Sequence, residues 1–230
     1  MNRKLTAALL IAAAVLTNVA FTVLGTVFDY PDVLKKPTDE ILTAFRAGQG
    51  PIAGWFTVLA LSAALFAPIA VGVGRLSRSA AMRAAVPVGI AAAVVQVAGL
   101  SRWPLLVPGF AADAADTDPS VASAGREHFE TAHQVLGTLI GETLGYALTA
   151  AWTILVIVAL GRTLAGRWFT VLGGVSAALI AAGVVSPLHV PGVDFANFIG
   201  YVLWSGWLLA FAVVLLRSPA DRPVLAGSPR

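Results

Sequence analysis

The chain has 230 residues, of which 58% are hydrophobic and 12% are charged, and it carries no cysteine. A soluble domain has under half apolar residues and about a quarter charged ones, so this composition excludes an ordinary soluble enzyme. The lack of cysteine excludes disulfides, thiolate metal sites and cysteine nucleophiles. The net charge of +3 does not indicate nucleic-acid binding, because the basic residues lie between apolar stretches and act as topology signals.

Six apolar stretches are each long enough to cross a bilayer, which takes about 20 apolar residues for roughly 30 Å of hydrocarbon. Because the bilayer interior has no water to bond the backbone N–H and C=O groups, these stretches must be helical. The sequence therefore predicts an all-α, six-transmembrane-helix bundle over 1–217, followed by a flexible cytoplasmic tail, 218–230. The predicted spans are about 5–28, 52–74, 84–104, 133–160, 168–187 and 196–216.

The first apolar stretch has a basic start, as a signal peptide would, but its apolar character continues to Phe28, which favours a retained helix. The connection that follows predicts a short helix, capped by Thr38 and ended by Gly48. Its apolar residues share one face, so it lies on the outer leaflet or over the bundle mouth, or packs on the loop as a plain surface helix. These apolar residues are Ile41, Leu42 and Phe45.

Polar residues and a proline mark the next spans. Pro68 predicts a kink in the second span. Gln96 in the third span, like Asn18 in the first, is typical of interhelical hydrogen bonding, with cavity lining as the alternative. The connection after the third span, roughly 109–131, carries several aspartates and is expected to be partly disordered.

Glu142 is the only acidic residue inside an apolar span, and an ionisable group there is costly enough to suggest a function with a named partner. Arg102, at a similar depth in the third span, is the obvious partner. A buried bridge between the two would only lock the bundle, whereas a functional Glu142 would bind a ligand or carry a proton. In the same span, Gly137, Gly141 and Gly145 form a small-xxx-small ladder that predicts close helix packing.

Histidines raise the alternative of a metal or haem site, with His133 and His189 as ligands from different segments. His128 and His133 are five residues apart, so they do not share one face of a helix. His133 and Glu142 differ by nine residues, which places them about 180° apart on an α-helix. The pattern favours metal or haem binding less than the other interpretations, and the cofactor stays unknown.

The basic residues lie on one side of the predicted membrane. Ten of the fifteen Lys and Arg residues fall before the first span, in the second–third and fourth–fifth connections, or in the tail. The other side carries ten of the twelve acidic residues. The positive-inside rule therefore places both termini in the cytoplasm, with the bundle in a bacterial plasma membrane.

An internal repeat relates the fourth and sixth spans at a spacing of 55 residues, because Gly145-Tyr146-Ala147-Leu148 matches Gly200-Tyr201-Val202-Leu203. The two helices run in the same direction, which indicates parallel helical-hairpin repeats about an axis along the membrane normal. The same spacing makes Asn197 equivalent to Glu142, and a looser alignment adds Trp55. We therefore predict a ring of polar and aromatic residues at the outer mouth, consisting of Trp55, Arg102, Glu142 and Asn197.

Three stretches resemble a bacterial family of small membrane proteins described as domain of unknown function 4386. They are Phe28-Asp29-Tyr30-Pro31-Asp32-Val33-Leu34, Arg102-Trp103-Pro104-Leu105-Leu106-Val107-Pro108-Gly109 and Gly141-Glu142-Thr143-Leu144-Gly145-Tyr146. The resemblance covers most of the chain. It implies a multi-pass architecture and no particular catalytic activity.

Together these patterns predict a membrane protein that binds a small ligand or ion at an outward-facing polar mouth, for transport or sensing. The alternatives are a structural or accessory subunit, as a homo-oligomer or with a membrane partner, and a His-dependent metal or haem protein. An enzyme is less favoured, because no Walker loop, HExxH or GxSxG motif occurs. The expected ligand-binding residues are Arg102, Glu142, Asn197, Trp55 and Trp103.

Overall fold

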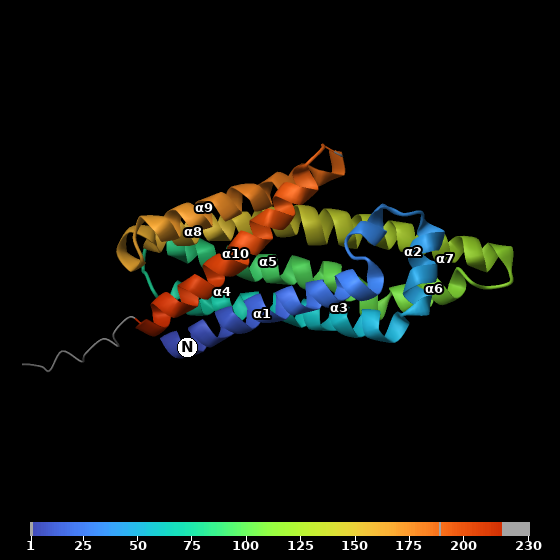
Figure 1. The fold of residues 1–230 in the computed structure, drawn as a ribbon, viewed down its shortest axis with the longest axis horizontal. Helices are drawn as coiled ribbons and strands as arrows, with labels where there is room; N and C mark the ends of the chain where they lie inside the picture. Colours follow the sequence, from blue (N-terminus) through green and yellow to red (C-terminus); the bar gives the residue numbers. More distant parts are fainter. Residues whose placement is uncertain (1, 189, 218–230) are drawn as a thin grey trace, which may run out of the picture.

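The computed structural model describes residues 2–188 and 190–217, with only the backbone described for Arg162 and Thr163. The secondary structure of these residues is helical throughout (Figure 1). Within them, six stretches of helix are long and apolar enough to cross a membrane, which confirms the predicted number of spans. They are Arg3–Phe28, Gln49–Gly74, Ala80–Asp113, Pro119–Gly161, Arg167–Leu188 and Val193–Arg217.

Several spans consist of more than one helical element. The elements that build the spans are α1 (Arg3–Phe28), α3 (Gln49–Ala64), α4 (Phe66–Gly74), α5 (Ala80–Leu105), α6 (Val107–Asp113), α7 (Pro119–Ala132), η2 (His133–Leu144), α8 (Gly145–Leu164), α9 (Arg167–Ala182), η3 (Gly183–Leu188) and α10 (Val193–Arg217). Two further elements, η1 (Asp32–Lys35) and α2 (Thr38–Ala47), connect α1 to α3.

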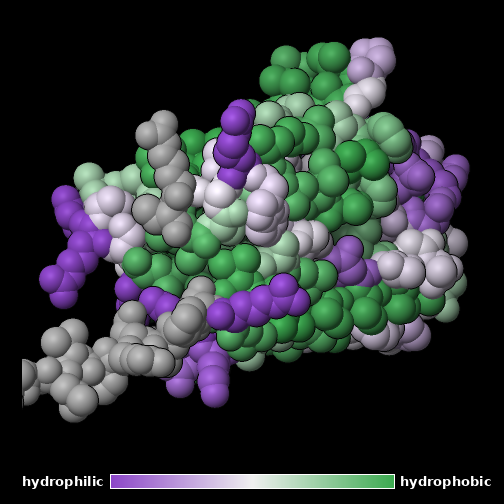
Figure 2. Space-filling view, turned by 60° about the vertical axis from the view of Figure 1, so that its left-hand side comes forward, coloured by the Kyte–Doolittle hydropathy of each residue, from purple (hydrophilic) through white to green (hydrophobic). Residues whose placement is uncertain are grey.

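The two ends of the bundle differ in character. One end holds the start of α1, the end of α10 and the α4–α5 and α8–α9 connections, and we call it the basic end (Figure 1, left). The opposite end is covered by α2, α6 and α7, and we call it the capped end (Figure 1, right). Between the ends the flank is broadly hydrophobic (Figure 2), with side chains such as Val94 and Val158 exposed. Such a surface suits a lipid environment.

The connection between the third and fourth spans is helical, so the prediction of partial disorder over 109–131 was wrong. α6 follows α5 after a single residue, Leu106. α7 then begins with Pro119 in its first turn, and the Asp118 side chain accepts a hydrogen bond from the backbone N–H of Ser120. These are strong helix-start signals, and they outweigh the polar composition of the segment.

α2 packs against α6 and α7 to complete the cap. Its predicted apolar face is confirmed, because Ile41, Leu42 and Phe45 are buried. The predicted capping role of Thr38 was wrong, since Pro37 precedes the helix and no side-chain cap bond forms. The Thr38 hydroxyl instead donates to the Glu130 carboxylate, 2.7 Å away on α7.

Pro68 interrupts the second span, as predicted. The span divides at Leu65 into α3 and α4, and Leu65 N–H bonds back to the carbonyl oxygens of Leu61 and Ser62. Proline has no N–H to bond the carbonyl four residues earlier, and its ring displaces that carbonyl, so the break lies one turn before it. The interruption falls in the middle of the span.

Two aromatic cores divide the bundle along its length. Toward the basic end, the rings of Trp152, Phe169, Trp207 and Phe211 are fully buried in one cluster. Toward the capped end, a second cluster surrounds Trp103, whose indole stacks on the Phe56 ring at a centroid distance of 4.8 Å.

Candidate functional site

Arg102 is the most unusual side chain in the bundle. It lies in the last turn of α5, where a cation interacts favourably with the helix dipole, yet only 4% of it is exposed. Its Nη1 donates to the carbonyl oxygen of Gly99 at 2.5 Å, and its Cζ stands 5.3 Å from the Trp103 ring centroid. Its Nε is buried and has no hydrogen-bond partner among the described residues. The guanidinium is therefore held by neutral groups.

His133 faces this guanidinium from the neighbouring span. Its Nδ1 lies 3.5 Å from Arg102 Nη2, and its ring stacks on Phe129 at a centroid distance of 5.8 Å. A guanidinium can only donate hydrogen bonds, so Nδ1 must present a lone pair and the proton of a neutral ring sits on Nε2. His133 thus acts as an acceptor that points at Arg102.

A glycine ladder lets α5 approach the fourth span closely, which confirms the predicted close packing. A Cβ at Gly137 would lie 2.7 Å from Arg102 Nη2, and one at Gly99 would lie 2.6 Å from the Cα of Gly141. A Cβ at Gly145 would lie 3.2 Å from Gln96 Cγ. Gly137 therefore provides the space in which the guanidinium sits.

The segment that faces Arg102 is a π-helix, and this changes which residues share a face. η2 runs for 12 residues from His133 to Leu144. Its i→i+5 hydrogen bonding widens each turn by about one residue, so positions nine apart are separated by about two full turns. The α-helical expectation that His133 and Glu142 point in opposite directions was wrong. The segment contains no proline, and nothing in the sequence distinguishes it from an ordinary α-helix.

Tyr30 joins the site from the turn between α1 and η1. The pKa of its phenol is raised to about 12, chiefly by burial and also by the Glu142 carboxylate, while the Arg102 guanidinium opposes the rise. The phenol is therefore within electrostatic range of both charged groups. Its ring packs edge-on against Phe21 and Phe56 at centroid distances of 5.2 and 5.1 Å. The sequence analysis did not single out this residue, although it lies inside one of the three stretches that resemble the family.

Glu142 and Arg102 do not form an ion pair. The ion pairs within 4.0 Å that the structure describes lie elsewhere, between Lys35 and Asp32, Lys36 and Asp29, and Arg126 and Asp39. Glu142 is partly buried on the last turn of η2, one turn before Tyr146. Both charged groups affect the pKa of the Tyr30 phenol, although they do not contact each other as an ion pair.

The other residues of the predicted ring make contacts of their own. Asn197 is 7% exposed, and its Nδ2 donates to the carbonyl oxygen of Ile180 at 2.9 Å, which ties α10 to α9. Trp55 is partly buried against the capped-end aromatic cluster. Of the predicted residues, the structure thus brings Trp103 into contact with Arg102 and places Glu142 within electrostatic range of it.

Comparison with known protein families identifies one matching family model. The family model described as Domain of unknown function (DUF4386) matches residues 5–212. The chain belongs to this family. No curated protein and no solved structure matches the chain. This match confirms the predicted resemblance. The matched range of this DUF4386 protein contains all the candidate residues described above.

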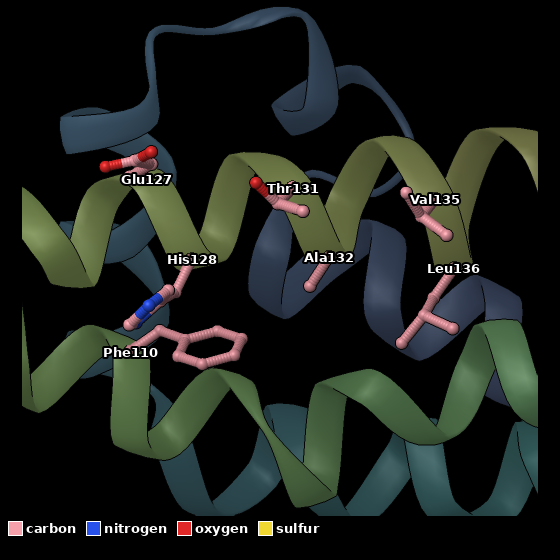
Figure 3. Close-up of a pocket in the computed structure, with 7 residues that line it drawn as sticks. All are labelled: Phe110, Glu127, His128, Thr131, Ala132, Val135 and Leu136. Atoms are coloured by element: carbon pink, nitrogen blue, oxygen red, sulfur yellow. The ribbon is translucent and has the colours of Figure 1, made fainter.

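An open groove lies between the third and fourth spans of this DUF4386 protein, toward the capped end. It has a volume of about 540 Å³ and runs between α6 and the α7–η2 helix. Figure 3 shows His128, Ala132 and Leu136 pointing from that helix toward the one that carries Phe110. Glu127, His128 and Thr131 supply the polar part of its lining. Arg102 is not among the residues that line the groove.

The residues give a metal centre little support. Among the described residues, no group of three or more His, Asp or Glu side chains could hold a metal ion. His133 lies beside the Arg102 guanidinium, and a cation bound there would be repelled by it. His189, the other predicted ligand, lies outside the described residues.

Proposed function

We propose that this protein binds a small anionic ligand in the outer half of the membrane, with Arg102 as the charge that holds it, in transport or sensing. The observation that carries the proposal is a guanidinium only 4% exposed, with no carboxylate within 4.0 Å in the described part of the chain. An uncompensated charge at that depth is costly. A bound carboxylate or phosphate would supply the missing charge and accept bidentate hydrogen bonds.

The orientation supports this placement. The basic end carries the Lys and Arg residues that the positive-inside rule assigns to the cytoplasm, so the capped end faces outward in a bacterial plasma membrane. Arg102, Tyr30 and Glu142 then lie near the outer boundary of the hydrocarbon. The cap covers Trp103 and with it Arg102, so a ligand from outside reaches the guanidinium only when the cap or the Tyr30 turn moves.

Glu142 makes anion binding depend on pH in this proposal. A carboxylate near the guanidinium repels a second anion unless it is protonated, so anion binding and proton uptake at Glu142 would be coupled. Binding would then strengthen as the pH falls in the wild type. The coupling is absent in Glu142→Gln, and anion affinity in that variant is expected to change little with pH.

The test is thermal unfolding of the detergent-purified protein, followed by tryptophan fluorescence, in graded acetate and phosphate. A ligand at 100 times its Kd stabilises the folded state by about 2.7 kcal/mol. The wild type should gain stability with at least one of the two anions. Arg102→Gln should lose that gain, while Arg46→Gln, which removes a half-buried arginine of the cap, should keep it. Equal anion responses in Arg102→Gln and the wild type would rule out the site.

A structural or accessory role is the second candidate, and one observation reduces its support. The glycine ladder that could have mediated association with another subunit faces α5 of the same chain. A stoichiometric partner that copurifies with the protein, together with no response to either anion, would favour this role over anion binding.

A further inference from the structure

A small cavity lies inside the bundle, below the Arg102 region. It has a volume of about 70 Å³ and is lined by residues of α1, α3, α4, α5 and α10. Most of its lining is apolar, but polar side chains reach it from four of these helices. They are Thr17, Ser62, Gln96, Tyr201 and Ser205.

The positions of its lining residues place the cavity near the middle of the membrane. Ser205 lies 12 residues before Arg217, and Gln96 lies 13 residues after Arg83. At a rise of about 1.5 Å per residue these separations correspond to about 18–20 Å from the basic end. The hydrocarbon is roughly 30 Å thick, so the cavity lies in its central part, closer to the capped end.

The cavity has both the room and the hydrogen-bonding groups that water needs. A water molecule occupies about 30 Å³ and requires two to four polar partners. The Ser205 hydroxyl accepts from Asn18 Nδ2 at 3.0 Å and still has bonding capacity left. Gln96 Nε2 donates to Thr149 Oγ1 at 2.9 Å, which leaves the Gln96 carbonyl oxygen without a protein donor among the described residues.

Two tyrosines connect the cavity to Glu142. Tyr146 lies one turn after Glu142, and its ring is 5.7 Å from that of Tyr201, which lines the cavity. We propose that the cavity holds water and forms the inner end of a polar route, open to water and protons, that begins at Glu142. Only the biological use of this route rests on the proposed anion-binding function. The hydration of the cavity is independent of it.

Below the cavity the route is closed. The Phe169 and Trp207 rings lie 4.9 Å apart and the Phe169 and Phe211 rings 5.2 Å apart, and all three side chains are fully buried. Trp207 Nε1 donates to the carbonyl oxygen of Phe169 at 3.1 Å, so the indole has no polar atom to offer water. Trp207 and Phe211 lie closer to Arg217 along α10 than Ser205 does, so this aromatic layer is on the basic-end side of the cavity. In this proposal, water and protons therefore reach mid-membrane from the capped side.

The natural absence of cysteine allows a direct test, because any single introduced thiol is the only one in the chain. Ag⁺ is small enough for the cavity and replaces the thiol proton to give a silver thiolate. Ser205→Cys and Ser62→Cys place a thiol at the cavity wall. Ser176→Cys is the control, since Ser176 is fully buried on α9 and does not line the cavity.

In protein reconstituted into vesicles, mass spectrometry would follow silver binding over time without added carboxylate or phosphate. Ser205→Cys and Ser62→Cys should react about ten-fold faster than Ser176→Cys, because only a hydrated thiol ionises readily. Rates equal to that of Ser176→Cys in both folded variants would mean a dry cavity and overturn the proposal. A failure of anion binding would leave all these rates unchanged, so the two proposals are tested separately.

The start of the route is tested by a second substitution in the Ser205→Cys protein. Glu142→Lys places a cation where Ag⁺ must pass and should slow the reaction by about ten-fold. Glu127→Lys makes the same charge change on the exposed face of α7 and should have little effect. A reaction that stays equally fast with Glu142→Lys would show that water reaches the cavity elsewhere, which refutes the route.

Discussion

Gly137→Ala tests whether the space around the Arg102 guanidinium is as tight as the structure indicates. The new Cβ would lie 2.7 Å from Nη2, 2.8 Å from Cζ and 3.2 Å from Nε of Arg102, so the guanidinium must move. Displacement removes its hydrogen bond to the Gly99 carbonyl oxygen and its contact with the Trp103 ring. Both interactions hold the guanidinium in its present position.

The expected cost follows from these losses. A hydrogen bond from a charged group contributes about 1.5–3 kcal/mol, and a cation–π contact about 0.5–1 kcal/mol. Alanine has a higher helix propensity than glycine, which stabilises the folded state by about 1 kcal/mol and offsets part of this loss. The free energy of unfolding should therefore fall by about 1–3 kcal/mol. For a chain of this size, 2 kcal/mol lowers Tm by about 4–8 °C.

The assay is thermal unfolding in detergent, read by tryptophan fluorescence, with Gly54→Ala as the matched control. Gly54 lies in a helix and has nothing within 4 Å of its added Cβ, so the propensity gain should appear there alone and raise Tm slightly. If Gly137→Ala were as stable as Gly54→Ala, the reasoning about a tightly enclosed guanidinium would be refuted.

Two further predictions concern neighbouring groups. Because the pKa of Tyr30 is about 12, above its ordinary value of 10.0, its phenol favours the folded state fully below pH 10 and loses this effect as the pH rises toward 12. Tyr30→Phe should therefore flatten the alkaline fall in Tm, and an unchanged fall would contradict the assignment. Asn197→Ala removes the side-chain bond to the Ile180 carbonyl oxygen, which keeps the backbone N–H of Gly183 as a donor, and should lower the free energy of unfolding by about 0.5–1.5 kcal/mol. Chemical or thermal unfolding would measure this loss, and a neutral effect would mean that the bond between α10 and α9 is dispensable.

Much of the fold could be predicted because it depends on local properties of the chain. The length of each apolar stretch, the break at Pro68 and the apolar face of α2 are visible in short windows of sequence. The glycine ladder was also predictable, since small residues four apart align on one helical face. The prediction failed at 109–131, where composition suggested disorder and the Asp118-Pro119 helix start was missed.

The candidate site was predictable only in part. The depth of Arg102 and Glu142 follows from counting residues to the basic connections, and their chemistry marks them as exceptional in a membrane. Their spacing does not follow, and the ion pair weighed in the sequence analysis does not form. Tyr30 was missed because it reaches the site from a turn, where no helical periodicity predicts its direction.

The sequence by itself determined that this DUF4386 protein is helical and has six apolar spans. Each apolar stretch is long enough to cross the hydrocarbon, and in lipid a helix satisfies the backbone hydrogen bonds within one segment. The tertiary structure alone decided that η2 is a π-helix, that α2, α6 and α7 cover one end, and that side chains from five helices line a small cavity in the middle of the bundle. These features depend on the hydrogen-bond register of one segment and on side chains that meet from distant parts of the chain. No local pattern encodes such contacts, so they appear only once the helices are packed together.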